Sequence, residues 1–400
     1  MSPKDFKKYL FVFFENIVVS GAYVGGAQIG FHLAFLHSQV SPVWPPEGIS
    51  LAAVLILGYR VSPGVVAGAF LANYLNNPHL PTACLIAIGN TLSVLLAAVL
   101  IHRFTGSNNP FTQARHVIRF LTIGTMPGAA LSALIGVTSL YAFGFVPPSS
   151  YLNVTATWWT GEMQGLVIIA PFLFAWRHLP EWKGRTKKYL IGRCTEALVL
   201  LLSLSGASIL VFHSTIPLTY LPIPIMLWAA FRFQLHGGVT ATIIISFVAT
   251  YFTVNHRGPF AEIAGEEISL NSSLLLLELY IGSLTVIALI VVATITERAG
   301  ALKEQQKYAL ELREQSQAFY RFVPEGFLRI LGKRSALDIQ LGDAREGVVT
   351  VLFSDVRSYT TISENLTPLQ NIELLNAYLA RIEPIIQSHG GFVDKFIGDA

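Results

Sequence analysis

The sequence predicts an α-helical multi-pass membrane bundle followed by the N-terminal part of a cytoplasmic α/β domain. Hydrophobic residues make up 52% of the 400-residue chain and charged residues only 13%, whereas charged residues make up roughly 25% of a soluble protein. Ten apolar segments follow one another up to residue 297, where the composition becomes strongly charged. From residue 348 onward, apolar runs of strand length flank a helical pattern, which indicates a soluble α/β domain.

The apolar segments predict an integral membrane domain over residues 1–297 with about eight to ten transmembrane segments. They cover approximately residues 9–36, 48–59, 64–77, 82–102, 120–145, 152–176, 194–213, 218–231, 237–254 and 273–297. A crossing needs about 20 residues, so the second, third, eighth and ninth segments are short. Each adjacent short pair forms either two crossings or one re-entrant hairpin, and both choices keep the number of crossings even.

Loop charges predict the orientation of this domain. The first segment follows Lys4, Lys7 and Lys8, as in a signal peptide, but it stays apolar to Leu36, which favours an uncleaved helix. With the N-terminus inside, fourteen Lys and Arg face the cytoplasm and only Arg257 lies outside, as the positive-inside rule requires. We expect an inner (plasma) membrane protein with both termini cytoplasmic. The chain has no basic stripe, so we expect the lipid bilayer and no nucleic acid as a partner.

Residues 298–320 predict a cytoplasmic linker helix. Leu302, Ala309, Leu312 and Phe319 occupy a and d positions of a heptad repeat, although Gln305 and Ser316 share the same seam. The segment is therefore either a weak parallel coiled coil or a solvated single helix.

The last part of the chain predicts strands and a helix around two aspartates. Val348–Phe353 reads as a buried strand, and Thr367 and Pro368 open a helix that Gly390 and Gly391 end. Phe392–Ile397 reads as the next strand. Asp355 and Asp399 each follow a strand, and hard divalent cations take carboxylate oxygens. Taken singly, each aspartate is better explained as an ordinary turn residue.

Two motifs in this part resemble the class III adenylate and guanylate cyclase family, which writes them F-x-D-I-R-G-F-T and G-x-x-D-K-x-x-G-D-A. Here Val356 replaces the family's Ile and Ser358 its Gly. The resemblance covers residues 321–400 and implies a ferredoxin-like α/β catalytic domain that is incomplete at Ala400. The motifs in this chain read Phe353-Ser354-Asp355-Val356-Arg357-Ser358-Tyr359-Thr360 and Gly391-Phe392-Val393-Asp394-Lys395-Phe396-Ile397-Gly398-Asp399-Ala400.

The resemblance implies an adenylate cyclase that converts ATP to 3′,5′-cyclic AMP and pyrophosphate. Asp355 and Asp399, with the Val356 carbonyl, would hold two Mg²⁺ or Mn²⁺ ions. Lys395 would face the purine and suits ATP, whereas guanylate cyclases commonly have Glu there, so guanylate cyclase specificity is the alternative. A homodimer through the catalytic domain and linker is implied. The phosphate-binding backbone amides would come from Arg357, Ser358, Tyr359 and Thr360.

The family's second base-reading residue and transition-state groups would follow residue 400. The 400-residue chain alone is therefore expected to be inactive, because lost electrostatic stabilisation costs on the order of 10² to 10³ per group.

A second resemblance, to the MASE1 integral membrane sensory domain, involves Gly, Pro and aromatic positions. Gly21 with Gly25, and Gly26 with Gly30, form small-xxx-small pairs that let helices approach closely. The quoted motifs are Trp44-Pro45-Pro46-Glu47-Gly48-Ile49, Gly58-Tyr59-Arg60 with Pro63-Gly64-Val65, Gly68-Ala69-Phe70-Leu71-Ala72-Asn73, and Trp158-Trp159 through Gly165 to Pro171.

Five polar residues at membrane depth are candidates for a sensor pocket. Polar groups there are costly, so they either line an interior cavity or form interhelical hydrogen bonds. The five are Glu47, Asn73, Asn90, Glu162 and Gln164.

The sequence leaves rival functions to be weighed. A multi-pass transporter, or a membrane sensor without cyclase activity, would explain the apolar segments but gives Asp355 and Asp399 no purpose. A MASE1-type diguanylate cyclase would need a Gly-Gly-Asp/Glu-Glu-Phe signature, and Ile397-Gly398-Asp399-Ala400 does not match it. The favoured function is signal transduction by a cyclase that the membrane domain regulates.

Overall fold

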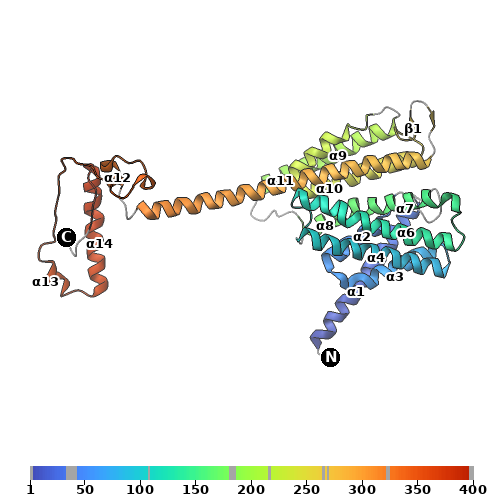
Figure 1. Cartoon of the computed structure of the whole chain (residues 1–400), viewed down its shortest axis with the longest axis horizontal. Helices are drawn as coiled ribbons and strands as arrows, with labels where there is room; N and C mark the ends of the chain where they lie inside the picture. Colours follow the sequence, from blue (N-terminus) through green and yellow to red (C-terminus); the bar gives the residue numbers. More distant parts are fainter. Residues whose placement is uncertain are drawn as a thin grey trace. The chain divides into compact units, whose positions relative to one another are not determined.

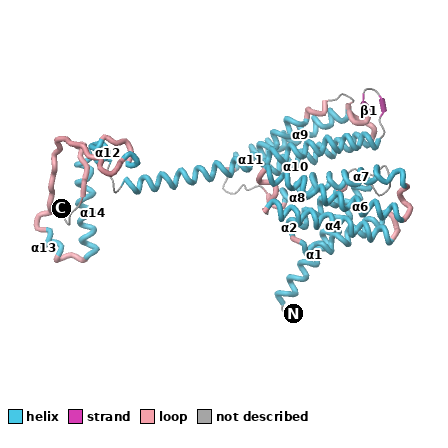
Figure 2. Tube along the Cα trace, in the orientation of Figure 1, coloured by secondary structure: helices cyan, strands magenta, loops and turns pink. Residues whose placement is uncertain are grey.

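A computed structural model describes most of the chain and divides it into two units, Met1–Gly300 and Ala301–Ala400. The described residues are 3–32, 43–106, 109–179, 186–214, 218–263, 266–267, 270–320 and 325–395. The first unit is almost entirely helical, and the second combines helices with long loops (Figures 1 and 2). Each unit is described by itself.

The first unit is a bundle of helices that matches the predicted apolar segments. Six helical segments of the described chain are long and apolar enough to cross a membrane. Each of the ten predicted apolar segments lies largely within a helix. The helices are α1 (Pro3–His32), α2 (Pro45–Leu57), α3 (Ser62–Asn76), α4 (Leu80–Thr105), α5 (Ala114–Arg119), α6 (Met126–Ala142), α7 (Tyr151–Gln164), α8 (Ala170–Trp176), α9 (Lys187–His213), α10 (Pro222–Val254) and α11 (Leu270–Tyr320).

Short elements join these helices. The π-helical turns Phe120–Thr125 and Gly165–Ile169 connect α5 to α6 and α7 to α8 without a break in the helical path. The 3₁₀ turns Tyr59–Val61 and Pro148–Ser150 precede α3 and α7. Between α10 and α11, β1 (Glu262–Ile263) and β2 (Glu266–Glu267) form a two-residue antiparallel pair.

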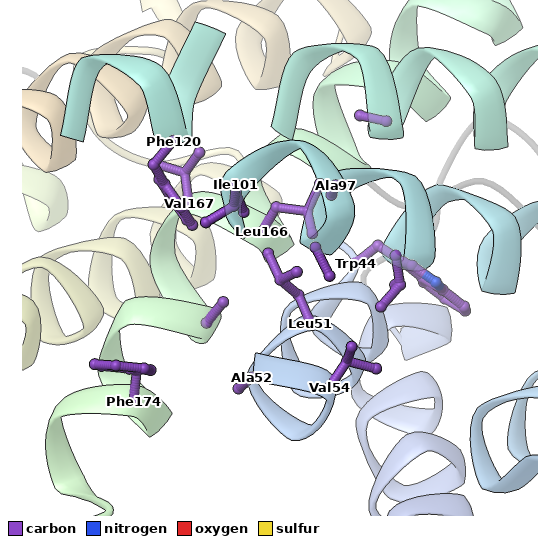
Figure 3. Close-up of a cluster of buried hydrophobic side chains, with 14 of the residues drawn as sticks. Trp44, Leu51, Ala52, Val54, Ala97, Ile101, Phe120, Leu166, Val167 and Phe174 are labelled. Atoms are coloured by element: carbon purple, nitrogen blue, oxygen red, sulfur yellow. The ribbon is translucent and has the colours of Figure 1, made fainter. Parts of the chain in front are cut away.

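Large apolar side chains fill the centre of the bundle and also cover its outside. Leu51 of α2, Ile101 of α4 and Leu166 lie together in the interior (Figure 3). On the outer surface, Leu152 and Phe247 are 79% and 71% exposed. A water-soluble protein rarely exposes so many large apolar side chains, whereas a lipid-facing surface requires them.

A close backbone contact joins the start of α2 to the end of α7 and to the π-helical turn that follows α7. A Cβ atom added at Gly48 would lie 2.1 Å from the Gly165 carbonyl oxygen, and one at Gly165 would lie 2.0 Å from the Trp44 carbonyl oxygen. In addition, the Trp44 N–H donates to the Gly161 carbonyl across 3.0 Å. Glycine is therefore the residue that allows these two helices to touch.

The two predicted small-residue pairs of α1 behave differently. Gly26 and Gly30 lie against Ile49 and Trp44, so this pair admits α2 as expected. Gly21 and Gly25 have no atom within 4 Å of an added Cβ. The prediction that they admit a neighbouring helix is therefore wrong within the described chain.

Two sharp bends in the chain are each closed by an Arg–Glu pair. Between α2 and α3 the chain turns at Gly58, where φ is 88°, and Arg60 Nη2 donates to Glu15 Oε1 of α1 across 2.8 Å. Within α10 the chain bends at Gln234, where φ is 50°, and Arg232 pairs with Glu196 of α9. The bend is tight, because a Cβ at Gly237 would lie 2.1 Å from the Ala229 carbonyl oxygen. The predicted eighth and ninth apolar segments are the two arms of this bend.

The second unit contains the end of α11 and three further helices, α12 (Glu325–Leu331), α13 (Tyr359–Ser363) and α14 (Pro368–Ser388). The predicted helix after Thr367 is confirmed as α14. Thr367 and Gln370 form a reciprocal capping box, and Gly390 takes a left-handed φ of 80° just after the helix. Side-chain capping and a terminal glycine are the expected helix boundaries.

The two predicted strands are absent from the described part of this unit. Residues 348–353 and 391–395 are loop, and Phe353 is 88% exposed. A strand exists only through hydrogen bonds to a neighbouring strand, and these segments have no such neighbour among residues 325–395. The apolar pattern therefore identifies segments that bury apolar side chains, but it does not identify the strand that would pair with them.

The backbone contact between α2 and α7 makes a direct prediction. Gly165→Ala should lower the free energy of unfolding of the chain in lipid nanodiscs by about 1–3 kcal/mol or more, because the added methyl overlaps the Trp44 carbonyl. Thermal unfolding followed by circular dichroism measures the effect. Gly21→Ala is the matched control, since its methyl meets nothing within 4 Å. Equal Tm values for Gly165→Ala and the unsubstituted chain would contradict the contact.

Candidate functional site

A buried polar network connects four helices at the centre of the first unit. Asn90 Nδ2 of α4 donates to the Tyr23 hydroxyl of α1 across 2.7 Å. The Ser132 hydroxyl of α6 lies 3.0 Å from Asn90 Oδ1 and 2.9 Å from Glu162 Oε1 of α7. Trp158 Nε1 donates to the same Glu162 oxygen across 3.0 Å. The Tyr23, Asn90 and Ser132 side chains are completely buried, so water does not satisfy these groups.

Glu47 of α2 brings a second carboxylate into this network. It is 0% exposed, and its polar neighbours are Ser93 of α4 and Glu162. Neither of its carboxylate oxygens has a hydrogen-bond partner, and Glu162 Oε2 and Ser93 Oγ also lack one. The site therefore contains acceptor oxygens that are buried and unsatisfied, which is costly in a protein interior.

Gln164 extends the site toward α11. Its Nε2 donates to the Glu278 carbonyl across 2.5 Å. Gly282, one turn further along α11, leaves room for this contact, because a Cβ there would lie 3.4 Å from Gln164 Nε2. Gln164 is the last residue of α7 before the π-helical turn Gly165–Ile169. Such turns are frequent at functional sites.

The structure thus brings together part of the predicted sensor pocket. Glu47, Asn90 and Glu162 belong to one network, and Gln164 lies on the same helix as Glu162. Asn73 stands apart, because its Nδ2 donates to the Ala69 carbonyl of its own helix across 2.8 Å. Its burial is explained by that bond alone.

Sequence reasoning missed five residues of this region, one of which is Ser93. Glu278 had a signal, since it is an acid inside the apolar segment 273–297, and it is only 4% exposed with both carboxylate oxygens unpartnered. Tyr23, Ser132 and Trp158 gave no such signal, because hydroxyl and indole groups are common in membrane helices and only packing reveals which of them meet a carboxylate.

The second unit displays the described residues of the predicted catalytic site on a loop and a short helix. Asp355 is exposed, and within residues 325–395 its carboxylate forms no ion pair or hydrogen bond. Val356 and Tyr359 form a turn, in which the Tyr359 N–H donates to the Val356 carbonyl across 3.2 Å. Ser358 lies in this turn with a left-handed φ of 57°, immediately before α13. Glycine adopts that conformation more readily, which explains why the related motif has Gly there.

Lys395 and Asp394 lie near the end of the described chain. Their side chains are 67% and 70% exposed and form an ion pair across 3.3 Å. Exposed pairs contribute little, so Lys395 is free to exchange this partner for another. The predicted metal ligand Asp399 lies outside the described residues, as do Arg321–Pro324. No group of three or more His, Cys, Asp or Glu side chains that could hold a metal is present in the described residues.

An ion pair fixes the loop that precedes this site. Lys333 Nζ lies 2.8 Å from Asp343 Oδ2. The hydrogen bond from Lys333 holds the pKa of Asp343 below its usual value.

Comparison with known proteins identifies both parts of the chain. Residues 16–299, which include the buried polar network, match the MASE1 family. The chain belongs to the MASE1 family. Residues 342–400 match the adenylate and guanylate cyclase catalytic domain, so the MASE1 domain precedes a class III cyclase domain in this protein.

Curated relatives are similar to the cyclase part. An adenylate cyclase of Anabaena cylindrica is 39% identical over 90 residues, 22% of this chain and 18% of that protein. The terminal-differentiation specific adenylate cyclase of Dictyostelium discoideum is 36% identical over 106 residues, 26% of this chain and 5% of that protein. A receptor-type guanylate cyclase of Caenorhabditis elegans is 29% identical over 110 residues, 26% of this chain and 9% of that protein.

The chain spans less than a fifth of the length of these relatives. No solved structure matches it.

Proposed function

We propose that this protein is a membrane-bound adenylate cyclase that converts ATP to 3′,5′-cyclic AMP and pyrophosphate under the control of a signal sensed by its MASE1 domain. The observation that supports this most directly is Asp355, an exposed carboxylate that directly precedes the Val356–Tyr359 turn, within a segment that matches the cyclase catalytic domain. The adenylate cyclases among the relatives support the same reaction. Residues 1–297 would be the sensory domain, 298–320 the linker and 321–400 the start of the catalytic domain.

The described residues fit the divalent metal that this reaction uses. Asp355 is an exposed carboxylate that forms no ion pair within residues 325–395, and the Val356 carbonyl retains a second lone pair beside its bond to Tyr359. Together with Asp399, these oxygens would hold Mg²⁺ or Mn²⁺. Bound there, two ions would activate the ribose 3′-hydroxyl and neutralise charge on the triphosphate.

The chain's own groups would position the triphosphate. The turn at Ser358 leads directly into α13, and the opening turn of a helix carries backbone N–H groups without carbonyl partners inside the helix. Such groups bind phosphate oxygens without help from particular side chains. Arg357, Ser358, Tyr359 and Thr360 are thus proposed to contact the triphosphate through their backbone, Tyr359 once its N–H leaves the Val356 carbonyl.

A homodimer is proposed to complete the active site. The apolar residues of the linker and of the segment 348–353 support it, since Leu302, Leu312 and Phe353 are 58%, 68% and 88% exposed within their unit. Apolar surface of this kind needs a covering partner, and a second copy would supply one.

The topology of the membrane domain is testable with reporter fusions. Fusions placed after Lys8, Arg185 and Lys303 should all report the cytoplasm, because fourteen Lys and Arg gather on one side of the predicted topology and one on the other. A periplasmic signal at any of these three positions would overturn the proposed orientation.

Loss of the Asp355 carboxylate should remove metal-dependent activity. In the complete enzyme, Asp355→Ala is expected to lower turnover by on the order of 10² or more at saturating Mg²⁺ or Mn²⁺, because a metal ligand is lost. Glu373→Ala, which removes an exposed acid of α14, is the control and should leave turnover unchanged. Near-normal activity of Asp355→Ala, with membrane insertion intact, would exclude Asp355 as a ligand.

Nucleotide choice should depend on Lys395. A lysine only donates hydrogen bonds, and adenine N1 accepts one, whereas guanine N1 carries a proton. Lys395→Glu in the complete enzyme should therefore lower kcat/KM for ATP and narrow the preference over GTP. Lys395→Arg keeps the donors and should keep the preference for ATP. An unchanged ATP to GTP ratio in Lys395→Glu would show that Lys395 does not read the base.

A further inference from the structure

Two carboxylates meet in the centre of the MASE1 domain without a positive partner. Glu47 and Glu162 are 0% and 1% exposed and interact with each other across the contact between α2 and α7. The other titratable group beside them is Tyr23 of α1. The facing residues of the remaining two helices, α4 and α6, are neutral, namely Asn90, Ser93 and Ser132.

Other glutamates of this domain have arginine partners, which Glu47 and Glu162 lack among the described residues. Glu15 pairs with Arg60, and Glu196 pairs with both Arg193 and Arg232. Glu47 and Glu162 have no arginine or lysine among the ion pairs of the described residues. Two unpaired negative charges in a low-dielectric interior are strongly unfavourable unless a positive charge joins them.

The buried polar atoms around the pair that lack hydrogen-bond partners are oxygens, apart from the indole Nε1 of Trp44, which lies beside Tyr23. Both Glu47 carboxylate oxygens, Glu162 Oε2 and Ser93 Oγ are buried and lack hydrogen-bond partners. Glu162 Oε1 is used differently, because it accepts from Ser132 and Trp158. Four oxygen donors, three of them from carboxyl groups, with no imidazole or thiolate among them, suit a hard cation such as Na⁺ or Ca²⁺ and do not suit a soft transition metal.

We propose that Glu47, Glu162 and Ser93 form a binding site for a hard alkali or alkaline-earth cation inside the MASE1 domain. The site deepens the proposed sensory function by naming what the domain binds, and so it rests on that function for its biological role. The rigid contact of Gly48 with Gly165 fixes the separation of the two carboxylates. Glu162 lies two residues before Gln164, and Gln164 contacts α11. A cation bound at the site would therefore affect the position of α11 through this contact.

Tryptophan fluorescence gives a direct test, because Trp158 donates to Glu162. The chain in lipid nanodiscs is titrated at pH 7 and constant ionic strength with NaCl, KCl or CaCl₂ against choline chloride. We expect a saturable fluorescence change with Na⁺ or Ca²⁺, a rise in Tm with the same cation, and no response to choline. Glu47→Gln and Glu162→Gln should each weaken the apparent affinity at least tenfold.

The substitutions also have an expected effect on the Tm when no binding cation is present. With only choline present, Glu47→Gln should not lower the Tm, because the amide has nearly the shape of the acid and removes a buried carboxyl group that has no positive partner. Glu278→Gln is the matched control, since Glu278 is another buried acid with unpartnered oxygens but lies on α11. It should leave the cation response unchanged. Ser93→Ala, which keeps both acids, should weaken cation affinity and provides a second readout if a glutamine variant fails to fold.

Several outcomes would overturn the site. A response that depends on pH but is equal for Na⁺, K⁺, Ca²⁺ and choline would mean that the pair binds protons only. A cation response that survives Glu47→Gln and Glu162→Gln but disappears in Glu278→Gln would move the site to α11. These readouts need no cyclase activity, so failure of the proposed enzyme function would leave them unaffected. A cyclase-active protein without any cation response would refute this inference alone.

Discussion

The contact between the backbones of α2 and α7 determines the geometry of the membrane unit. Gly48 and Gly165 leave no room for a side chain, and the Trp44 N–H donates to the Gly161 carbonyl. Because two helices in contact through backbone atoms cannot slide freely, the residues beside the contact are held in register. Glu47 precedes Gly48, and Glu162 follows Gly161. The meeting of the two carboxylates is therefore a consequence of where glycine permits the helices to touch.

The two bends closed by Arg–Glu pairs show that one structural solution occurs twice in the bundle. In each, a long helix supplies the glutamate and the following bend supplies the arginine, as Glu15 with Arg60 and Glu196 with Arg232. The sequence already shows an echo, in which Tyr59-Arg60 with Gly64-Val65 recurs as Phe231-Arg232 with Gly238-Val239. Matching interrupted helices in two halves are typical of membrane domains with a central site.

Helices were predicted well from the sequence because their signals are local. Apolar length locates the membrane helices, and Thr367, Pro368 and Gly390 mark the ends of α14. The polar network was predicted only in part, since Tyr23 and Ser132 acquire their roles from helices distant in sequence. The predicted strand Val348–Phe353 and the described part of the predicted strand Phe392–Ile397 are loop for a related reason: apolarity describes a surface, whereas a strand also requires a neighbour. Features that depend on local sequence are thus predictable, whereas pairing between distant segments is not.

The path from the buried network to α11 depends on one glycine and one continuous helix. Gly282 lets Gln164 reach the Glu278 carbonyl, so a movement of α7 at Glu162 acts on the backbone of α11 directly. Glu278 lies in the part of α11 that belongs to the first unit, and α11 ends at Tyr320. A continuous helix transmits rotation or translation better than a loop, because its backbone hydrogen bonds resist local bending. A small displacement beside the carboxylate pair would therefore act on the membrane part of α11 through the contact of Gln164 with Glu278.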